Sequence, residues 1–98
     1  MILKGCAFAF NADKDVWLHR NRGVGFDGIV SAIERGVVRA VKKHPNAEKY
    51  PHQMMLEIVI DGYGYAIPFV IQNDGTVFMK TICPSRKVTK TFDKSAKK

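Results

Sequence analysis

The sequence predicts an α+β domain in which two helices pack on one face of a mostly antiparallel sheet of four to five strands. Three observations support this class. Helical apolar spacing is confined to the first third of the chain, and the second half alternates β-rich runs with tight-turn sequences. A hydrophobic content of 46% is also enough for one core. The predicted element order is β-α-α-β-β-β-β.

The length of 98 residues indicates a single domain that spans residues 1–98. Polar and charged side chains dominate the end of the chain, so we expect residues 93–98 to form a frayed tail. The sequence contains no internal repeat and no linker-like stretch, which agrees with one domain.

The first third of the chain is predicted to form a short strand and a helix. Residues 6–10 alternate aromatic and small side chains, as a strand with one packed face does. Asn11 is the expected N-cap of the helix, which should end near Arg22 because Gly23 follows. We expect this helix to bury one apolar stripe: Ala12, Val16 and Trp17.

A second helix is expected to begin near Phe26. Its apolar side chains have the amphipathic spacing i, i+3, i+4 and i+7: Phe26, Ile29, Val30 and Ile33. Gly36 is expected to end this helix. The valine-rich stretch 37–43 should then form a strand.

The second half is predicted to hold three more strands: residues 54–60, 63–71 and 76–83. The Asp-Gly pair at 61–62 is a strong hairpin sequence, and residues 73–75 mark the next turn. Pro68 indicates an edge or a bulge within its strand, and Pro84 ends the last strand. Residues 86–92 are expected to form either a short helix or an extended arm.

Basic residues are concentrated at the C-terminal end. The net charge is +7; residues 80–98 hold seven Lys or Arg against one acidic residue, whereas residues 1–79 hold nine against eight. Such a cluster is either a solvated tail or a contact surface for RNA, DNA or an acidic protein. The sequence has no membrane-length apolar run and no signal-peptide core, so we expect a cytoplasmic protein without a membrane partner.

No motif of a common enzyme class or cofactor site occurs. The chain has no P-loop, no complete dinucleotide fingerprint and no GxSxG or HExxH motif. Cys6 and Cys83 are far apart, and no histidine stands at ligand spacing from either. We therefore expect two small buried cysteines, no metal site and no cofactor. His19 is expected to be an ordinary surface residue.

Two groups of residues could act on a phosphodiester. The first group follows the last predicted strand: Lys80, Ser85, Arg86, Lys87, Thr89 and Lys90. Guanidinium and ammonium groups bind phosphate and stabilise charge that develops on it. The second group lies in the proline-flanked loop 44–53: His44, Lys49, Tyr50 and His52. Histidine suits acid–base chemistry near neutral pH, although exposed histidines are also ordinary in such a loop.

Several segments together resemble a known family. The most specific are His-Pro-Asn-x-Glu-Lys-Tyr-Pro with its following Gln, within residues 44–53, and Lys-Thr-Ile-x-Pro-Ser-Arg-Lys at 80–87. Looser matches lie at residues 8–14 and 22–33. Over residues 8–91 the chain is similar to BrnT-like toxins of the RelE-like superfamily, which belong to type II toxin–antitoxin systems.

The resemblance implies an α+β fold and an mRNA-cleaving endoribonuclease that acts by 2′-OH attack without a metal. A co-encoded antitoxin would neutralise it, in a hetero-oligomer or with the toxin as a homodimer. Toxins of this superfamily tend to cleave with Arg, Lys and Tyr rather than with a pair of histidines, which implies Arg86, Lys80 and Tyr50 as catalytic residues. His52 is added from the loop as a further candidate for proton transfer. The implied RNA-binding residues are Lys49, Ser85, Lys87 and Lys90. Arg86 matches the family's Ser-x-Arg, whereas Pro84 stands where the family has serine.

The alternative is a non-catalytic basic module that binds an antitoxin or nucleic acid. Its basis is the basic C-terminal segment itself, because phosphate binding needs positive charge but no acid–base pair. Both hypotheses expect RNA or an acidic protein as the partner.

Overall fold

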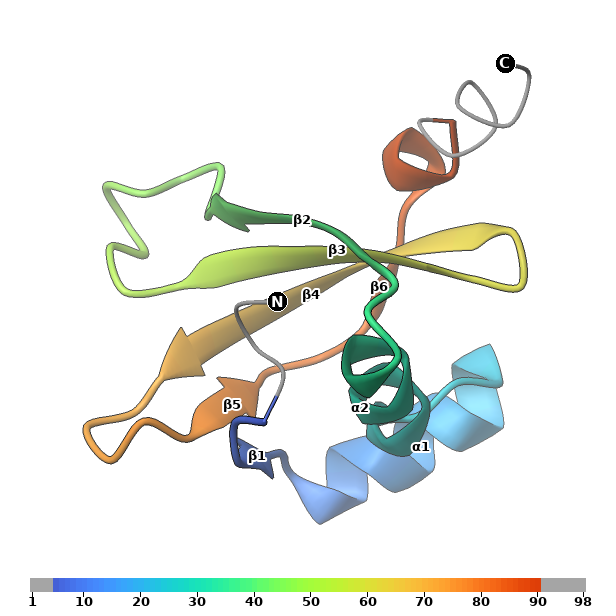
Figure 1. Cartoon of the computed structure of the whole chain (residues 1–98), viewed down its shortest axis with the longest axis horizontal. Helices are drawn as coiled ribbons and strands as arrows, with labels where there is room; N and C mark the ends of the chain where they lie inside the picture. Colours follow the sequence, from blue (N-terminus) through green and yellow to red (C-terminus); the bar gives the residue numbers. More distant parts are fainter. Residues whose placement is uncertain (1–4, 91–98) are drawn as a thin grey trace.

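A mixed β-sheet carries two helices on one face, in agreement with the α+β class that the sequence predicts (Figure 1). The computed structural model describes residues 5–90, and the tail expected at residues 93–98 lies outside them. The elements, in chain order, are β1 (Phe8–Ala9), α1 (Ala12–Arg22), α2 (Phe26–Glu34), β2 (Val38–Lys43), β3 (Met54–Ile60), β4 (Tyr63–Ile71), β5 (Val77–Met79) and β6 (Cys83–Pro84).

The sheet order is β1-β5-β4-β3-β2, with β6 paired to β4. The β1–β5 pair is parallel and the other pairs are antiparallel. The hairpin predicted between β3 and β4 is confirmed, since Asp61 and Gly62 have φ of 53° and 80°, as a type I′ turn requires.

The strand predicted at residues 76–83 is divided into β5 and β6, which both pair with the same edge of β4. Pro68, in the middle of β4, lies opposite this break. Its carbonyl accepts a hydrogen bond from the Lys80 N–H at 2.8 Å, but its ring nitrogen has no hydrogen to donate. The ladder is therefore interrupted on this side, and the sheet has one strand more than predicted.

The bounds and caps predicted for α1 are confirmed. The Asn11 side chain accepts a hydrogen bond from the Lys14 N–H at 2.9 Å, and Gly23 ends the helix with φ of 67°. The prediction that α1 buries Ala12, Val16 and Trp17 is wrong. Val16 and Trp17 are 53% and 44% exposed, and Ala12 is exposed as well.

Helix α1 packs instead through residues at positions i, i+3, i+4 and i+7: Asp15, Leu18, His19 and Arg22. Only Leu18 of these is apolar, and it is fully buried. Asp15 accepts a hydrogen bond from the Phe26 N–H, and the Arg22 guanidinium donates to the Ile82 carbonyl. The spacing of apolar residues could not identify this face of α1, because three of its four residues are polar.

Helix α2 has the amphipathic face that its spacing predicts. Phe26, Ile29 and Ile33 are fully buried, and Val30 packs at the margin of the core. Both helices cover the same sheet face, whose core residues are at most 1% exposed: Leu56, Ile58, Ile67, Phe69, Val77 and Met79. Cys6 and Cys83 are half-buried rather than buried.

Of the segment 86–92, residues 86–90 are helical, as the first of the two expected conformations has it, and residues 91–92 lie outside the described residues. Figure 1 shows these turns on the opposite side of the sheet from α1 and α2. The buried Val88 packs against Gly64 of β4, where an added Cβ would lie 2.7 Å from the Val88 Cβ and 2.5 Å from the Thr89 nitrogen. Glycine at position 64 therefore permits the close approach of this helix.

Candidate nucleic-acid interface

The sheet face opposite α1 and α2 is called the open face below. It carries a row of residues that crosses the sheet from β2 to the segment that follows β5. Lys42 of β2 is in register with Met55 of β3, and Met55 is in register with Pro68 of β4. Residues directly opposite in neighbouring strands share a face. Lys80 continues the row, since its N–H bonds to the Pro68 carbonyl. The row thus has a lysine at each end and an apolar floor between them.

An aromatic ring extends this floor. Phe78 is in register with Val70 of β4, which lies two residues from Pro68 and so on the same face. The Lys80 ammonium lies 5.6 Å from the centre of the Phe78 ring. The acidic Glu57, also on the open face, is paired with the Lys42 ammonium at 3.4 Å.

Charge is divided unevenly between the helical layer and the rest of the fold. Residues 5–37, which form β1 and both helices, contain four Lys or Arg and four Asp or Glu. Residues 38–90, which form the remaining strands and the C-terminal helical turns, contain eight basic and four acidic residues. Within the described chain, the excess positive charge therefore belongs to the sheet and its connections.

The loop between β2 and β3 is held by its own hydrogen bonds. The His44 N–H donates to the Gln53 carbonyl at 3.2 Å, and the Tyr50 N–H donates to the Asn46 carbonyl at 3.0 Å. The Asn46 N–H also donates to His44 Nδ1 at 3.0 Å, so a neutral His44 ring carries its proton on Nε2. The loop therefore presents its side chains from a defined backbone.

Side chains in this loop gather around Tyr50. The His44 and Tyr50 rings are 4.6 Å apart, and the Lys49 ammonium is 5.4 Å from the Tyr50 ring centre. His52 is exposed. A cation, a phenol and the His44 imidazole thus occur together at one end of the sheet.

The hydroxyls of the C-terminal group serve the fold. Ser85 Oγ accepts a hydrogen bond from the Val88 N–H at 3.2 Å and so caps the final helical turns. Thr89 Oγ1 accepts from the Gly64 N–H at 2.7 Å and donates to the Ser85 carbonyl at 2.9 Å. The charged members of the group are exposed: Arg86, Lys87 and Lys90.

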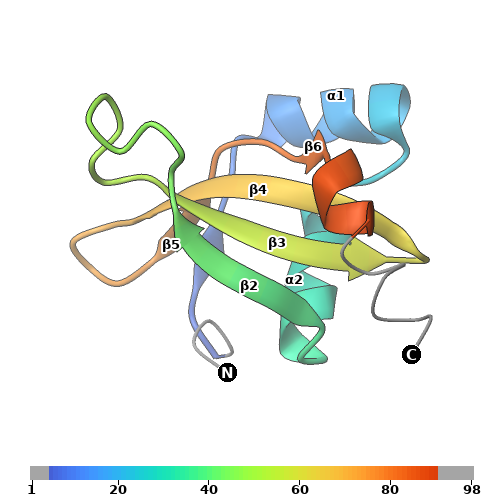
Figure 2. The ribbon, with the colours of Figure 1, turned by 90° about the horizontal axis from the view of Figure 1, so that it is seen from above.

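The structure does not bring the two predicted groups together. Met54, next to the loop, pairs with Phe69, whereas Gly64, which accepts a hydrogen bond from the Ser85 N–H, pairs with Val59. Five residues along β3 correspond to about 17 Å. Figure 2 shows the loop and the final helical turns at opposite ends of the hairpin. Arg86 therefore lies at the far end from Lys49, Tyr50 and His52, whereas Lys80 lies on the row next to the loop.

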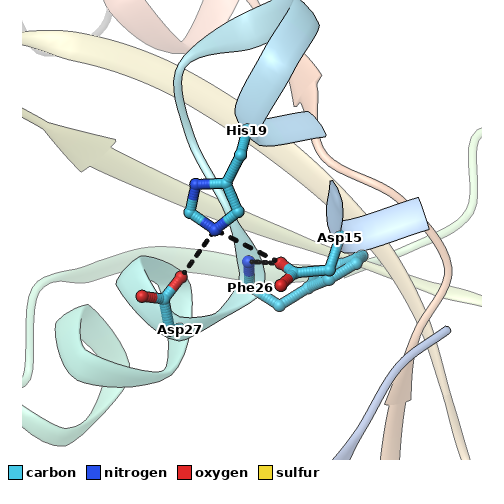
Figure 3. A network of polar contacts seen from close by, with 4 residues as sticks. All are labelled: Asp15, His19, Phe26 and Asp27. Atoms are coloured by element: carbon cyan, nitrogen blue, oxygen red, sulfur yellow. Dashed lines mark hydrogen bonds and ion pairs between the residues drawn. The ribbon is translucent and has the colours of Figure 1, made fainter. Parts of the chain in front are cut away.

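One polar cluster was missed by the sequence analysis. His19 Nε2 lies 3.3 Å from a carboxylate oxygen of Asp27 and 3.7 Å from one of Asp15 (Figure 3). The spacing of Asp15 and His19, one helical turn apart, was the available signal. The position of Asp27 follows only from how α2 packs against α1.

Comparison with models of protein families, with curated proteins and with solved structures gave no match. Within residues 5–90, no helix has the combination of length and apolar composition needed to cross a bilayer. We therefore infer function from the geometry of the open face and of the loop beside it.

Proposed function

We propose that this protein binds single-stranded RNA and that its open face contacts the sugar–phosphate backbone and bases. The observation that carries the proposal is the row Lys42–Met55–Pro68–Lys80. Binding surfaces for single strands combine positive charge for phosphates with aromatic or apolar surface for bases. The row and the adjacent Phe78 supply both.

The dimensions of the row suit an extended ligand. Neighbouring strands are about 4.8 Å apart, so Lys42 and the backbone of Lys80 are separated by about 14 Å across the sheet. Arg86 and Lys90, exposed at the far end of the hairpin, add positive charge along the strand direction. These charges support contact with several phosphates, which is what non-specific RNA affinity depends on.

The test is fluorescence anisotropy with a labelled single-stranded RNA, measured over a series of salt concentrations. We expect the double variant Lys42→Gln/Lys80→Gln to weaken binding and to reduce the slope of log K against log salt by about 1.4. The matched control is Arg20→Gln/Arg35→Gln, which removes the same charge from exposed positions on the helical layer. Equal losses in the two double variants would contradict binding at the open face.

A second candidate function is RNA cleavage by a toxin of a toxin–antitoxin pair, in which loop 44–53 performs the chemistry. The arrangement of His44, Lys49 and Tyr50 favours it, since a phenol lies beside an imidazole, tilted by 45° to it, and near an ammonium group, and these are groups that can transfer protons. A base, with exposed His52 as the candidate, would take the 2′-OH proton, and the 2′-oxygen would attack phosphorus. The 5′-oxygen would take a proton from Tyr50, the candidate acid, and leave as a hydroxyl, with a 2′,3′-cyclic phosphate on the other product.

Induced expression tests this candidate. We expect growth arrest and new 5′-OH RNA ends, both lost in Tyr50→Phe and His52→Gln. Tyr63→Phe is the matched control, because Tyr63 is an exposed tyrosine at the other end of the hairpin. RNA binding without new 5′-OH ends would exclude cleavage and leave the binding function intact.

Under the toxin candidate, the partner is an acidic antitoxin that covers the basic open face. Complex formation should then weaken as salt rises, because the attraction is between exposed charges. A pull-down with the product of the adjacent gene, at two salt concentrations, measures this.

A further inference from the structure

Three side chains with metal-binding atoms converge where α1 meets α2 (Figure 3). Asp15 and His19 come from successive turns of α1, and Asp27 comes from the first turn of α2. One donor atom from each residue lies within 4.8 Å of the other two. The imidazole nitrogen distinguishes this group from the solvated carboxylate pairs that are common on protein surfaces.

The distances agree with shared coordination of one ion. Zinc binds imidazole nitrogen and carboxylate oxygen at about 2.0–2.2 Å, so two donors on a tetrahedral ion are about 3.4 Å apart. His19 Nε2 is 3.3 Å from the Asp27 oxygen and 3.7 Å from the Asp15 oxygen. Small rotations of the exposed His19 and Asp27 side chains would complete the geometry.

The surrounding backbone holds two of the three ligands in place. The Phe26 N–H donates to Asp15 Oδ1 at 2.8 Å and fixes the orientation of that carboxylate, as an outer hydrogen bond commonly does for a metal ligand. Gly25 faces the His19 ring, and an added Cβ there would lie 2.0 Å from Nε2. The absence of a side chain at position 25 leaves the space that the ring occupies.

We propose that Asp15, His19 and Asp27 bind a divalent transition-metal ion of the zinc class and that this ion joins α1 to α2. Two carboxylates balance the charge of the ion, and a neutral imidazole supplies the nitrogen ligand that zinc accepts and that calcium and magnesium do not prefer. The exposed side of the cluster leaves the remaining position to water. The site is structural, and it is independent of RNA binding.

A metal would strengthen a contact that is otherwise poor in apolar packing. Leu18 is the one fully buried apolar side chain of α1, and Asp15 and Arg22 add polar contacts to backbone groups. The competing explanation is that a protonated His19 pairs with the two carboxylates and needs no ion. The two explanations differ in the response of thermal stability to zinc.

The experiment uses tag-free protein, freed of metal by chelation, whose Tm is measured at pH 7.5 with and without zinc. We expect zinc to raise Tm by about 4 °C or more at saturation, and EDTA to reverse the rise. Asp27→Asn and His19→Gln should abolish most of the shift. Asp27 is 78% exposed, so its variant tests the site without affecting the core. His52→Gln, at an exposed histidine outside the cluster, should retain the full shift.

Cobalt provides a second readout. Cobalt(II) bound to nitrogen and oxygen ligands gives weak visible absorption, and binding to Cys6 or Cys83 would add an intense thiolate charge-transfer band. We expect the visible bands without the thiolate band, and their loss in His19→Gln. No Tm shift in the unaltered protein, a shift retained in both cluster variants, or a thiolate band would each overturn the proposal.

Discussion

The two faces of the sheet are formed by the same strands but differ in what covers them. On the covered face, Leu56 and its neighbours are buried under helices α1 and α2. On the open face, Met55 and Pro68 lie half-buried between two lysines. Since side chains alternate along a strand, adjacent residues in β3 belong to opposite faces. The covered face therefore holds the core, and the open face is the one that is proposed to bind RNA.

The largest expected effect is a difference in stability between variants at two adjacent residues of β3, one on each face of the sheet. Leu56→Ala removes a side chain that is 1% exposed, and we expect it to lower the free energy of unfolding by about 2–5 kcal/mol. Met55→Ala, on the open face, should cost much less stability but weaken RNA binding. Urea unfolding and RNA anisotropy on both variants measure this. A stability loss at Met55 as large as at Leu56 would contradict the division.

A smaller effect concerns the part of the open face that the helical residues 86–90 cover. Gly64→Ala would place a Cβ against Val88 and Thr89, so we expect it to displace the final helical turns and to destabilise the protein by about 1–3 kcal/mol. Gly28→Ala is the control: an added Cβ there meets nothing within 4 Å, and alanine favours the helix by about 0.5–1 kcal/mol. Amide exchange of residues 86–90 should rise only in Gly64→Ala.

The smallest effect is the titration of a tyrosine on the covered face. Burial raises the pKa of Tyr65 above its ordinary value, and the nearby Tyr63 and Asp61 raise it further. The fold therefore favours the neutral phenol, and this contribution to stability is present below about pH 10 and is lost as pH rises through the folded-state pKa. Phenolate absorbance should show one late-titrating group that is missing in Tyr65→Phe. An unchanged titration curve in that variant would contradict the assignment.

The two helices show how much of the fold the sequence could reveal. Helix α2 is docked by Phe26, Ile29 and Ile33, so its apolar spacing predicted its face. Helix α1 is docked largely through Asp15 and Arg22, whose partners are backbone groups far away in the sequence. Apolar periodicity carries no information on such contacts, so the predicted stripe was wrong although the helix bounds and caps were confirmed.

The candidate site was predicted in composition but not in arrangement. The basic residues and the loop were identified from their residue types alone. Their separation depends on β5 and β6, which both run antiparallel to β4 and so carry Arg86 to the end of the hairpin opposite His52. The interruption at Pro68 shifts the register between β5 and β6 by only one residue, so the antiparallel direction of these strands produces the separation.

The most direct test of the proposed RNA interface is an NMR titration of the labelled protein with single-stranded RNA at low salt. If RNA binds on the open face, the amide signals of Lys42, Met55 and Lys80 shift with a common affinity, and those on the exposed side of α1 do not. Shifts concentrated on α1, around the exposed Trp17, with an unchanged open face would contradict the account.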